Sequence, residues 1–376
     1  MELAGARHFV NVLTFNAGSS SMKFGIYSVV GDRAQPLFAR AVAMEPTVVG
    51  ATAATESALQ RGLPTDIAFD AVGHRMVFGG PDDRPALASP ALFARLERFE
   101  RLDPLHAPAA LAALRTTHRY LAHLPNVLCF DTAFFHDLPE LARLLPIENQ
   151  EPEFLRRYGF HGLSYEYVRA SLGRDLGDRA ILAHLGSGAS LAALRDGKPI
   201  ESTMGFSALG GIIMATRPGD IDPGALLYLL EERKQSPAEL RRSLEERSGL
   251  RALSGGERDL RRLIECGDDS RAVLAVDAFC TSVVKAVGAL AAVLGGLDTL
   301  VFTGGVGEHL ATIRASIVER LAFLGVRIDD DANRRHAAVI SARASTVTVR
   351  IVATDENATI ARATATVVNA LSESTP

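Results

Sequence analysis

One short turn near the N-terminus, Asn16-Ala17-Gly18-Ser19-Ser20-Ser21-Met22-Lys23-Phe24, constrains the fold more than any other stretch of this 376-residue chain. An apolar run (10–15) leads into it and an alternating run (24–29) leads out, which predicts a strand, a tight turn and a second strand. One glycine, three hydroxyls and a lysine suit a backbone wrapped around phosphate. The turn is not a P-loop, because G-x-x-x-x-G-K-S/T occurs nowhere in the chain. Taken alone, the nine residues fit an ordinary polar hairpin turn better.

A second segment, Ala180 to Leu194, has the same plan about half a chain later. Gly186 and Gly188 lie at its turn, as Gly18 lies at the first. A duplicated domain would explain both segments, although so short a match is weak evidence for a repeat.

The length of the chain favours two domains of roughly 150–200 residues each. Asp222 and Ser236 each precede a proline, the pattern of an N-cap followed by Pro at the first helical position. Short apolar strands alternate with helical periodicity, so the sequence predicts an α/β fold. The expected helices are 105–121, 223–232, 237–247, 271–294, 310–323 and 356–371, and the expected strands include 127–130 and 299–303.

The composition is globular, with 47% hydrophobic and 22% charged residues, and it argues against several classes of function. A net charge of −4 gives no general reason to bind nucleic acid or a membrane surface. The longest apolar stretch (272–296) is interrupted by Asp277 and Lys285, so it is interpreted as a buried helix rather than a membrane span. The three cysteines form no CxxC pair and residues 1–10 resemble no export signal, so we expect a cytoplasmic location.

Two short segments place a charged side chain at the end of an apolar strand. In the first, Gly73 to Gly80, an arginine (Arg75) could present its fork to a phosphate or carboxylate, or lie on the surface beside a loop. In the second, Phe130 to His136, Asp131 lies at the strand's carboxyl end, where open α/β sheets bind ligands. A helix N-cap is an equally good local interpretation of Asp131.

Four further segments could carry chemistry. His161 lies between an aromatic residue and a glycine in Arg157 to Ser164, where a packing role is the alternative to a ligand-facing one. A glycine-rich loop around Arg217 (204–223) is costly to order unless it binds something, although it could be a long surface loop capped by Asp222. Residues 302–309 run from a strand through three glycines to a helix, which suits a nucleotide. Residues 354–357 place carboxylates at a helix start, as ligands of Mg²⁺ or as N-caps.

Taken together and in this order, these segments resemble the acetate kinase family over residues 16–362. The resemblance implies an α/β, two-domain, actin-like kinase fold, a duplicated ribonuclease H-like fold with an active-site cleft between the domains. The first domain would comprise residues 1–133 and 358–376, and the second, nucleotide-binding domain residues 134–357. The implied activity is reversible, ATP-dependent phosphorylation of acetate to acetyl phosphate, by direct in-line transfer. Mg²⁺ (or Mn²⁺), a homodimer and no nucleic-acid or membrane partner are expected with it.

The resemblance also implies a role for each matching residue. Asn16 and Glu356 would form the magnesium site, and Arg75 and Arg217 would clamp phosphate. Asp131 would lie at the active centre, and His161 would contact the moving phosphoryl group. The residues implied to bind ATP are Lys23, His184, Gly186, Ser187, Gly188, Gly304, Gly305, Gly307 and Glu308, and those implied near the acid are Arg75, Val77, Leu105, His106, Phe160 and Ala208.

The chain departs from the family pattern at several positions. Ser187 replaces an asparagine in the second phosphate turn, so contact with the γ-phosphate is expected to be weaker. Tyr165, Phe78 and His309 stand where the family has histidine, histidine and asparagine. Ala208 replaces a proline and opens the alkyl pocket slightly, so propionate or a larger acid is an alternative substrate. A nucleotide-binding protein with weak turnover and an altered phosphoryl donor are the other hypotheses.

Overall fold

The computed structural model describes residues 9–18, 21–81, 83–100 and 107–373. The chain divides into two compact units, the first made of residues 1–136, 162–167 and 355–376 and the second of residues 137–161 and 168–354. Compared with the expected domains, the first unit also takes in residues 134–136, 162–167 and 355–357. One helix, α5 (Gly162–Leu172), begins in the first unit and ends in the second.

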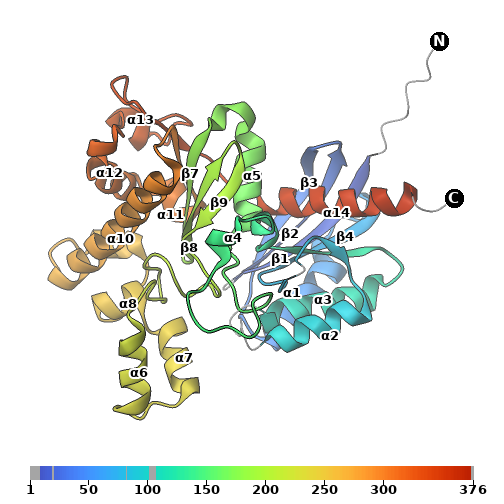
Figure 1. Ribbon diagram of the computed structural model, residues 1–376. Coiled ribbons are helices and arrows are strands. Elements are labelled where there is room, and N and C mark those ends of the chain that lie inside the picture. Colours follow the sequence, from blue (N-terminus) through green and yellow to red (C-terminus); the bar gives the residue numbers. More distant parts are fainter. Residues whose placement is uncertain (1–8, 19–20, 82, 101–106, 374–376) are drawn as a thin grey trace. The chain divides into compact units, whose positions relative to one another are not determined.

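The first unit is built on a six-stranded sheet with the order β3-β2-β1-β4-β6-β5. Its strands β1 to β4 are labelled in Figure 1. The predicted N-terminal hairpin is its antiparallel β1–β2 pair, in which Asn16 lies opposite Lys23. Beyond β1 the strands β4 and β6 run parallel to it. The strands are β1 (Val10–Ala17), β2 (Ser21–Val30), β3 (Arg33–Ala43), β4 (Ala71–Met76), β5 (Ala86–Leu87) and β6 (Asn126–Phe130).

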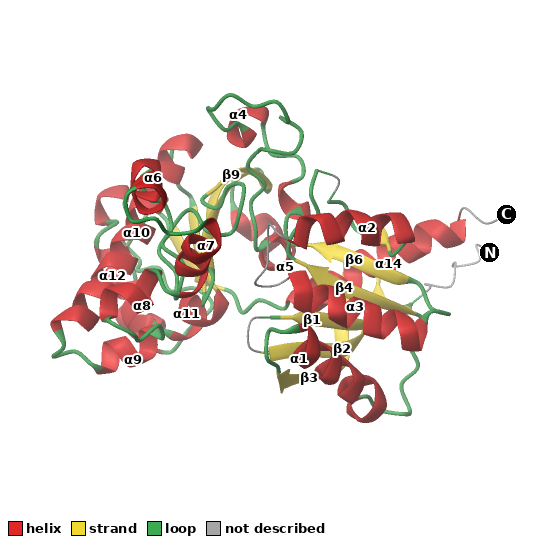
Figure 2. Cartoon of the chain, turned by 90° about the horizontal axis from the view of Figure 1, so that it is seen from below, coloured by secondary structure: helices red, strands yellow, loops and turns green. Residues whose placement is uncertain are grey.

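Helices cover both faces of this sheet because its central strands are apolar on both sides. On one face, Phe15, Phe24 and Ile26 pack with alanines of α1 and α3. Figure 2 labels these two helices beside the strands of the sheet. On the other face, Val12 and Tyr27 pack with alanines of α14. The helices of this unit are α1 (Val48–Ser57), α2 (Pro90–Phe99), α3 (Ala107–Leu121) and α14 (Glu356–Glu373), with a π turn at Ala58–Gly62 and a 3-10 turn at Ala133–Phe135.

The second unit repeats the topology of the first. Its five-stranded sheet has the order β9-β8-β7-β10-β11, with an antiparallel hairpin (β7–β8) followed by two parallel strands. The two strand–turn–strand segments of the sequence are therefore the matching hairpins of two similar sheets. The strands are β7 (Arg179–Leu185), β8 (Ala189–Arg195), β9 (Lys198–Ser202), β10 (Thr299–Thr303) and β11 (Thr348–Ile351).

The long apolar helix of the second unit, α10 (Ser270–Leu294), packs against β7 and β8. Its length and composition would allow it to cross a membrane, and a third of its most apolar window is buried inside the protein. The other helices are α4 (Glu140–Arg143), α6 (Pro223–Glu231), α7 (Pro237–Glu246), α8 (Gly249–Ser254), α9 (Leu260–Glu265), α11 (Gly304–His309), α12 (Ala311–Glu319) and α13 (Asp330–Arg334), with 3-10 turns at Gly173–Leu176 and Ala322–Leu324.

Most predicted helix ends are confirmed. Asp222 and Ser236 are the N-caps of α6 and α7, and Ser236 forms a full capping box with Glu239. The helix expected over 310–323 is shorter, because α12 ends at Glu319 and gives way to a 3-10 turn. No disulfide forms, since all three cysteines are free.

Candidate active site

The first unit gathers three polar side chains around Arg75. The guanidinium donates from Nε and Nη2 to Asp131 Oδ2, at 3.2 and 2.6 Å. Its Nη1 donates to Asn16 Oδ1 at 3.1 Å and lies 3.7 Å from Glu356 Oε2. Asn16 Nδ2 in turn donates to Glu356 Oε2 at 2.8 Å. We call Asn16, Arg75, Asp131 and Glu356 the arginine cluster.

Three parallel strands and one helix position the arginine cluster. Asn16 lies near the carboxyl end of β1, Arg75 near that of β4, and Asp131 directly after β6. Because parallel strands end at the same edge of a sheet, three side chains distant in sequence meet there. Glu356 is the first residue of α14, which covers this sheet. The Asp131 side chain binds Arg75, and the following 3-10 turn has no side-chain cap, so the N-cap interpretation of Asp131 is wrong.

The start of α14 is tied to the sheet by Tyr27. Asp355 caps the helix, because its Oδ1 accepts from the N–H of Ala358 at 3.1 Å. The hydroxyl of Tyr27 lies 3.2 and 3.1 Å from the two carboxylate oxygens of Asp355. Burial, and then the nearby charge of Asp355, raise the pKa of Tyr27 above its ordinary value of 10.0, so the phenol keeps its proton and donates.

The second unit holds His161 in a specific orientation. Its backbone has φ +61°, a left-handed conformation that is unusual for a residue with a side chain. Its Nδ1 lies 2.9 Å from the hydroxyl of the buried Ser190, and its ring stacks on His184 with centroids 4.3 Å apart. His184 and Ser190 face each other across the β7–β8 hairpin. The hairpin therefore supplies both groups that hold the imidazole.

Arg217 lies close to the same hairpin turn. A methyl group at Gly188 would lie 3.2 Å from His161 Nε2 and 3.3 Å from Arg217 Nη2, so both side chains face that glycine. Arg217 is only 8% exposed, and its Nη1 donates to the carbonyl of Ala208 at 2.9 Å. The glycine-rich loop is thus anchored by a buried arginine and is not a loose surface segment. His161, His184, Gly188, Ser190 and Arg217 are called the histidine cluster.

The second glycine-rich turn lies beside the first. Gly304 has φ +75°, and a methyl group there would lie 2.7 Å from the carbonyl of Leu185, so the position accepts only glycine. Glu308 Oε1 accepts from the N–H of Gly304 at 3.0 Å and from that of Thr354 at 3.2 Å. The hydroxyl of Thr303, just before the turn, is buried and has no hydrogen-bond partner within the described part of the chain. A ligand bound at this turn would be able to provide one.

The remaining predicted residues are distributed over both units. Val77 belongs to the first unit, and Phe160 and Ala208 belong to the second. Lys23 is exposed on β2, Ser187 is exposed in its turn, and Gly305 has open space where a side chain would lie. Leu105 and His106 lie outside the described residues.

Two departures from the family pattern have structural roles. Tyr165 is fully buried and packs against Phe134 and Phe135, with ring centroids 6.0 and 5.9 Å away. Phe78 packs edge-on against Phe99 at 5.5 Å. Both aromatic side chains therefore pack against other aromatic rings within the first unit.

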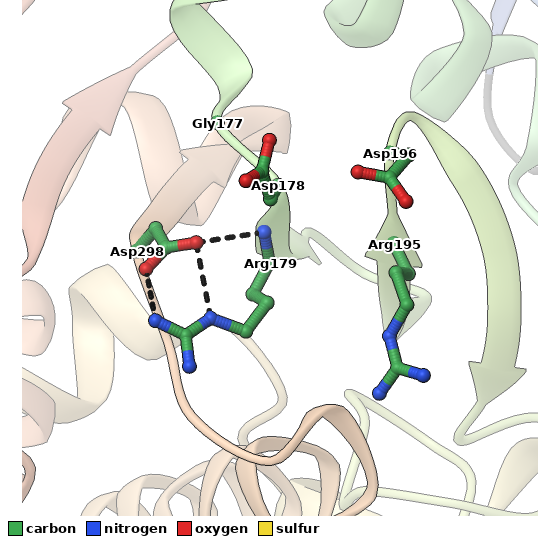
Figure 3. A pocket seen from close by; sticks show the side chains of 6 residues that line it. All are labelled: Gly177, Asp178, Arg179, Arg195, Asp196 and Asp298. Atoms are coloured by element: carbon green, nitrogen blue, oxygen red, sulfur yellow. Dashed lines mark hydrogen bonds and ion pairs between the residues drawn. The ribbon is translucent and has the colours of Figure 1, made fainter.

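A surface cavity of about 580 Å³ lies at the other end of the second sheet (Figure 3). Arg179, which pairs with Asp298, begins β7, whereas the glycine-rich turn follows the end of that strand. Arg179 also donates to Gly295 and Arg195 to Leu294, so these arginines bind the last carbonyls of α10. Three carboxylates line the cavity and would repel a phosphate. Its lining residues are Gly177, Asp178, Arg179, Arg195, Asp196 and Asp298.

Comparison with known proteins identifies the family and the fold of the chain. The chain matches the Acetokinase family over residues 50–362. It is 43% identical to an acetate kinase of Nitrobacter hamburgensis, with 94% of this chain and 95% of that protein aligned. The chain is similar to the crystal structure of Porphyromonas gingivalis acetate kinase, with a TM-score of 0.80 and 32% sequence identity. The aligned region covers 96% of this chain and 100% of that one. The crystal structure of a propionate kinase from Francisella tularensis has a TM-score of 0.82 and 30% sequence identity to this chain. The aligned region covers 95% of this chain and 99% of that one. The two-sheet, actin-like α/β fold is confirmed, and the chain belongs to the acetate kinase family.

Proposed function

We propose that this chain is a short-chain carboxylate kinase, which transfers the γ-phosphoryl group of ATP reversibly to acetate and forms acetyl phosphate. The observation that carries the proposal is the arginine cluster, in which a guanidinium is held by Asp131 and Asn16 at the ligand-binding edge of a sheet. The reaction joins two anions, so their repulsion is the main obstacle. A carboxylate is already nucleophilic and needs no strong base. Positioning and charge neutralisation therefore supply most of the catalysis.

The oxygen atoms of the arginine cluster fit a magnesium ion. No group of three His, Cys, Asp or Glu side chains suited to a metal is found among the described residues. Mg²⁺, however, is usually held by one or two carboxylates together with phosphate oxygens and water. Glu356 and Asn16, which are hydrogen-bonded to each other, would hold the ion. Bound there, Mg²⁺ would neutralise part of the phosphate charge. Mn²⁺ would be able to do the same in its place.

His161 and Arg217 of the histidine cluster would act on the transferred phosphoryl group. Ser190 holds Nδ1 of His161, which leaves Nε2 on the side of Gly188 and Arg217. Arg217 would neutralise charge on the equatorial oxygens, and His161 would donate a hydrogen bond to one of them. The turn 186–188 and the turn at Gly304, Gly305 and Gly307 would hold ATP. Glu308 would contribute by fixing the second turn, since it binds the N–H of Gly304. The two units would be the two domains of the actin-like fold.

The acid would bind with its carboxylate toward Arg75 and its alkyl end among Val77, Leu105, Phe160 and Ala208. Ala208 has a small side chain, and its carbonyl accepts a hydrogen bond from Arg217. One methylene changes discrimination by only about 1–3 kcal/mol. Propionate is therefore the alternative substrate.

A hydroxylamine trapping assay tests the activity. Purified protein would be given MgATP, hydroxylamine and carboxylic acids of two to five carbons, and acyl hydroxamate would be measured. We expect product with acetate or propionate, and none without the acid. Absence of product with every acid, despite measurable ATP binding, would refute the kinase function. Replacing ATP by GTP or pyrophosphate in the same assay tests the hypothesis of an altered donor, which the serine at position 187 motivates.

We further propose that the protein is a cytoplasmic homodimer. Helix α6 contains four leucines and a tyrosine in nine residues, yet none of its residues is buried. Leu227 and Tyr228 are each 53% exposed there. An apolar helix of this kind on the surface suits contact with a second copy of the chain. Sedimentation of the wild type and of a Leu227→Glu variant would test this assembly, the variant being expected to sediment as a monomer.

A further inference from the structure

We propose that Tyr27 is a positioning residue for Glu356, acting through Asp355. The inference rests on the proposed function only in taking Glu356 to be a ligand of the metal–nucleotide complex. Tyr27 would hold the carboxylate that caps α14, and so fix the first turn of the helix from which Glu356 reaches Asn16 and Arg75.

The hydroxyl of Tyr27 has no packing role. Its ring is 3% exposed and lies among Val10, Val12, Val29 and alanines of α14. A phenylalanine would fill this apolar space equally well. A buried hydroxyl costs free energy unless it finds a partner, and Asp355 is that partner. The hydroxyl is therefore explained by what it does to Asp355.

Asp355 connects Tyr27 with the arginine cluster. Its carboxylate accepts from Tyr27 and from the N–H of Ala358, and its negative charge is favourable at a helix N-terminus. Glu356 is the next residue, and its Oε2 accepts from Asn16 at 2.8 Å. With both carboxylate oxygens of Asp355 near one hydroxyl, the side chain cannot rotate freely. Loss of that hydroxyl would loosen the cap and the placement of Glu356 together.

Four variants test the proposal: Tyr27→Phe, Asp355→Asn, Asp355→Ala and the double variant Tyr27→Phe/Asp355→Ala. Tyr120→Phe is the matched control, because this tyrosine of the same unit accepts a hydrogen bond from Gln60 away from the cluster. The first measurement is binding of Mn²⁺ to the protein with ADP, followed by the electron paramagnetic resonance of free Mn²⁺. The second is the Mg²⁺ concentration that gives half-maximal hydroxamate formation, together with the KM for acetate.

We expect Tyr27→Phe to weaken binding of Mn²⁺ about tenfold and to raise the Mg²⁺ requirement similarly, as loss of an outer partner of a metal ligand typically does. The KM for acetate should change less than twofold. Asp355→Asn keeps one acceptor oxygen, which at the position of Oδ1 can take the hydrogen bonds from both Tyr27 and Ala358, so it should stay closer to the wild type than Asp355→Ala. Tyr27→Phe should add nothing to the loss caused by Asp355→Ala, because both act through one contact.

Wild-type binding of Mn²⁺ by Tyr27→Phe would overturn the proposal, as would losses that multiply in the double variant. If Tyr27→Phe fails to fold, the comparison of Asp355→Asn with Asp355→Ala decides, since equal losses in both would contradict the role of the accepted hydrogen bonds. Failure of the proposed function looks different: no acid gives hydroxamate with the wild type, whereas the shift in Mn²⁺ binding persists.

Discussion

Arg75 and Asp131 form an ion pair in which two nitrogens of one guanidinium donate to a single carboxylate oxygen, Oδ2. Asp131 is 1% exposed, so its charge is almost wholly removed from water. The pair therefore orients the guanidinium and also makes the buried carboxylate tolerable. Replacement of Arg75 should therefore lower both the activity and the stability of the protein.

Arg75→Ala is expected to lower kcat on the order of 10³-fold, by analogy with the loss of other phosphate-clamping arginines. It should also lower the free energy of unfolding by about 3 kcal/mol, because one partner of a buried pair is removed. Hydroxamate formation and urea unfolding measure the two effects. Arg119→Ala is the control, since Arg119 is exposed and pairs loosely with Glu56. Full activity in Arg75→Ala would refute the proposed clamp.

Gly188→Ala tests whether His161 and Arg217 act as one cluster. The added methyl group would lie 3.2 Å from His161 Nε2 and 3.3 Å from Arg217 Nη2, so at least one side chain must move by a few tenths of an ångström. We expect kcat to fall by about tenfold or more with little change in melting temperature, since small misplacements of reacting groups are costly. Gly288→Ala on α10 is the matched control, because a methyl group there meets nothing within 4 Å. Equal kcat in the two variants would contradict the proximity.

Local patterns in the sequence predict the elements, whereas the site roles of the arginine cluster follow from the resemblance to the acetate kinase family. The hairpins, the caps at Asp222 and Ser236 and the closing helix follow from periodicity and capping preferences, which depend on near neighbours. Asn16, Arg75, Asp131 and Glu356 were named from motifs, and the structure brings all four together. Their catalytic roles stay predictions.

Contacts between elements that are distant in the sequence could not be predicted. Tyr27 and Asp355 are 328 residues apart and meet only because α14 covers the β2 face of the sheet. Ser190 was overlooked as the partner of His161, although alternation along the β7–β8 hairpin places it opposite His184. A hairpin register drawn from the turn at 186–188 could have found it.

Ser187→Asn restores the family residue in the turn that we propose holds ATP. Ser187 is exposed, so the longer amide can be accommodated without repacking. One added hydrogen bond is worth about 1 kcal/mol, which corresponds to a KM for ATP lowered by about fivefold. The KM for acetate should not change. Ser187→Ala is the paired variant and should raise the KM for ATP; the same KM for ATP in all three proteins would exclude contact between residue 187 and the nucleotide.

His74 makes the first unit sensitive to acid. Its ring is buried, stacks on Phe15 and contacts Asn126 Oδ1 at 3.0 Å. Burial lowers the pKa of His74 from 6.5 to about 4. Between these values the unfolded chain binds a proton that the folded chain does not. The free energy of unfolding is therefore undiminished by His74 above pH 6.5 and decreases as the pH falls toward 4. The loss amounts to about 3 kcal/mol.

The variant His74→Gln, which keeps a donor for Asn126 and does not titrate, should unfold with a flatter dependence on pH. Cys129 lies on β6 beside β4, and burial raises the pKa of its thiol to about 12, so it reacts only when this unit opens. In a background with Cys266→Ser and Cys280→Ser, its labelling by 4,4′-dithiodipyridine in urea at pH 7 and pH 4 measures unfolding of the first unit. From pH 7 to pH 4, the free energy of unfolding of the first unit should decrease by about 3 kcal/mol more in the wild type than in His74→Gln. Equal losses would show that His74 does not cause the acid sensitivity.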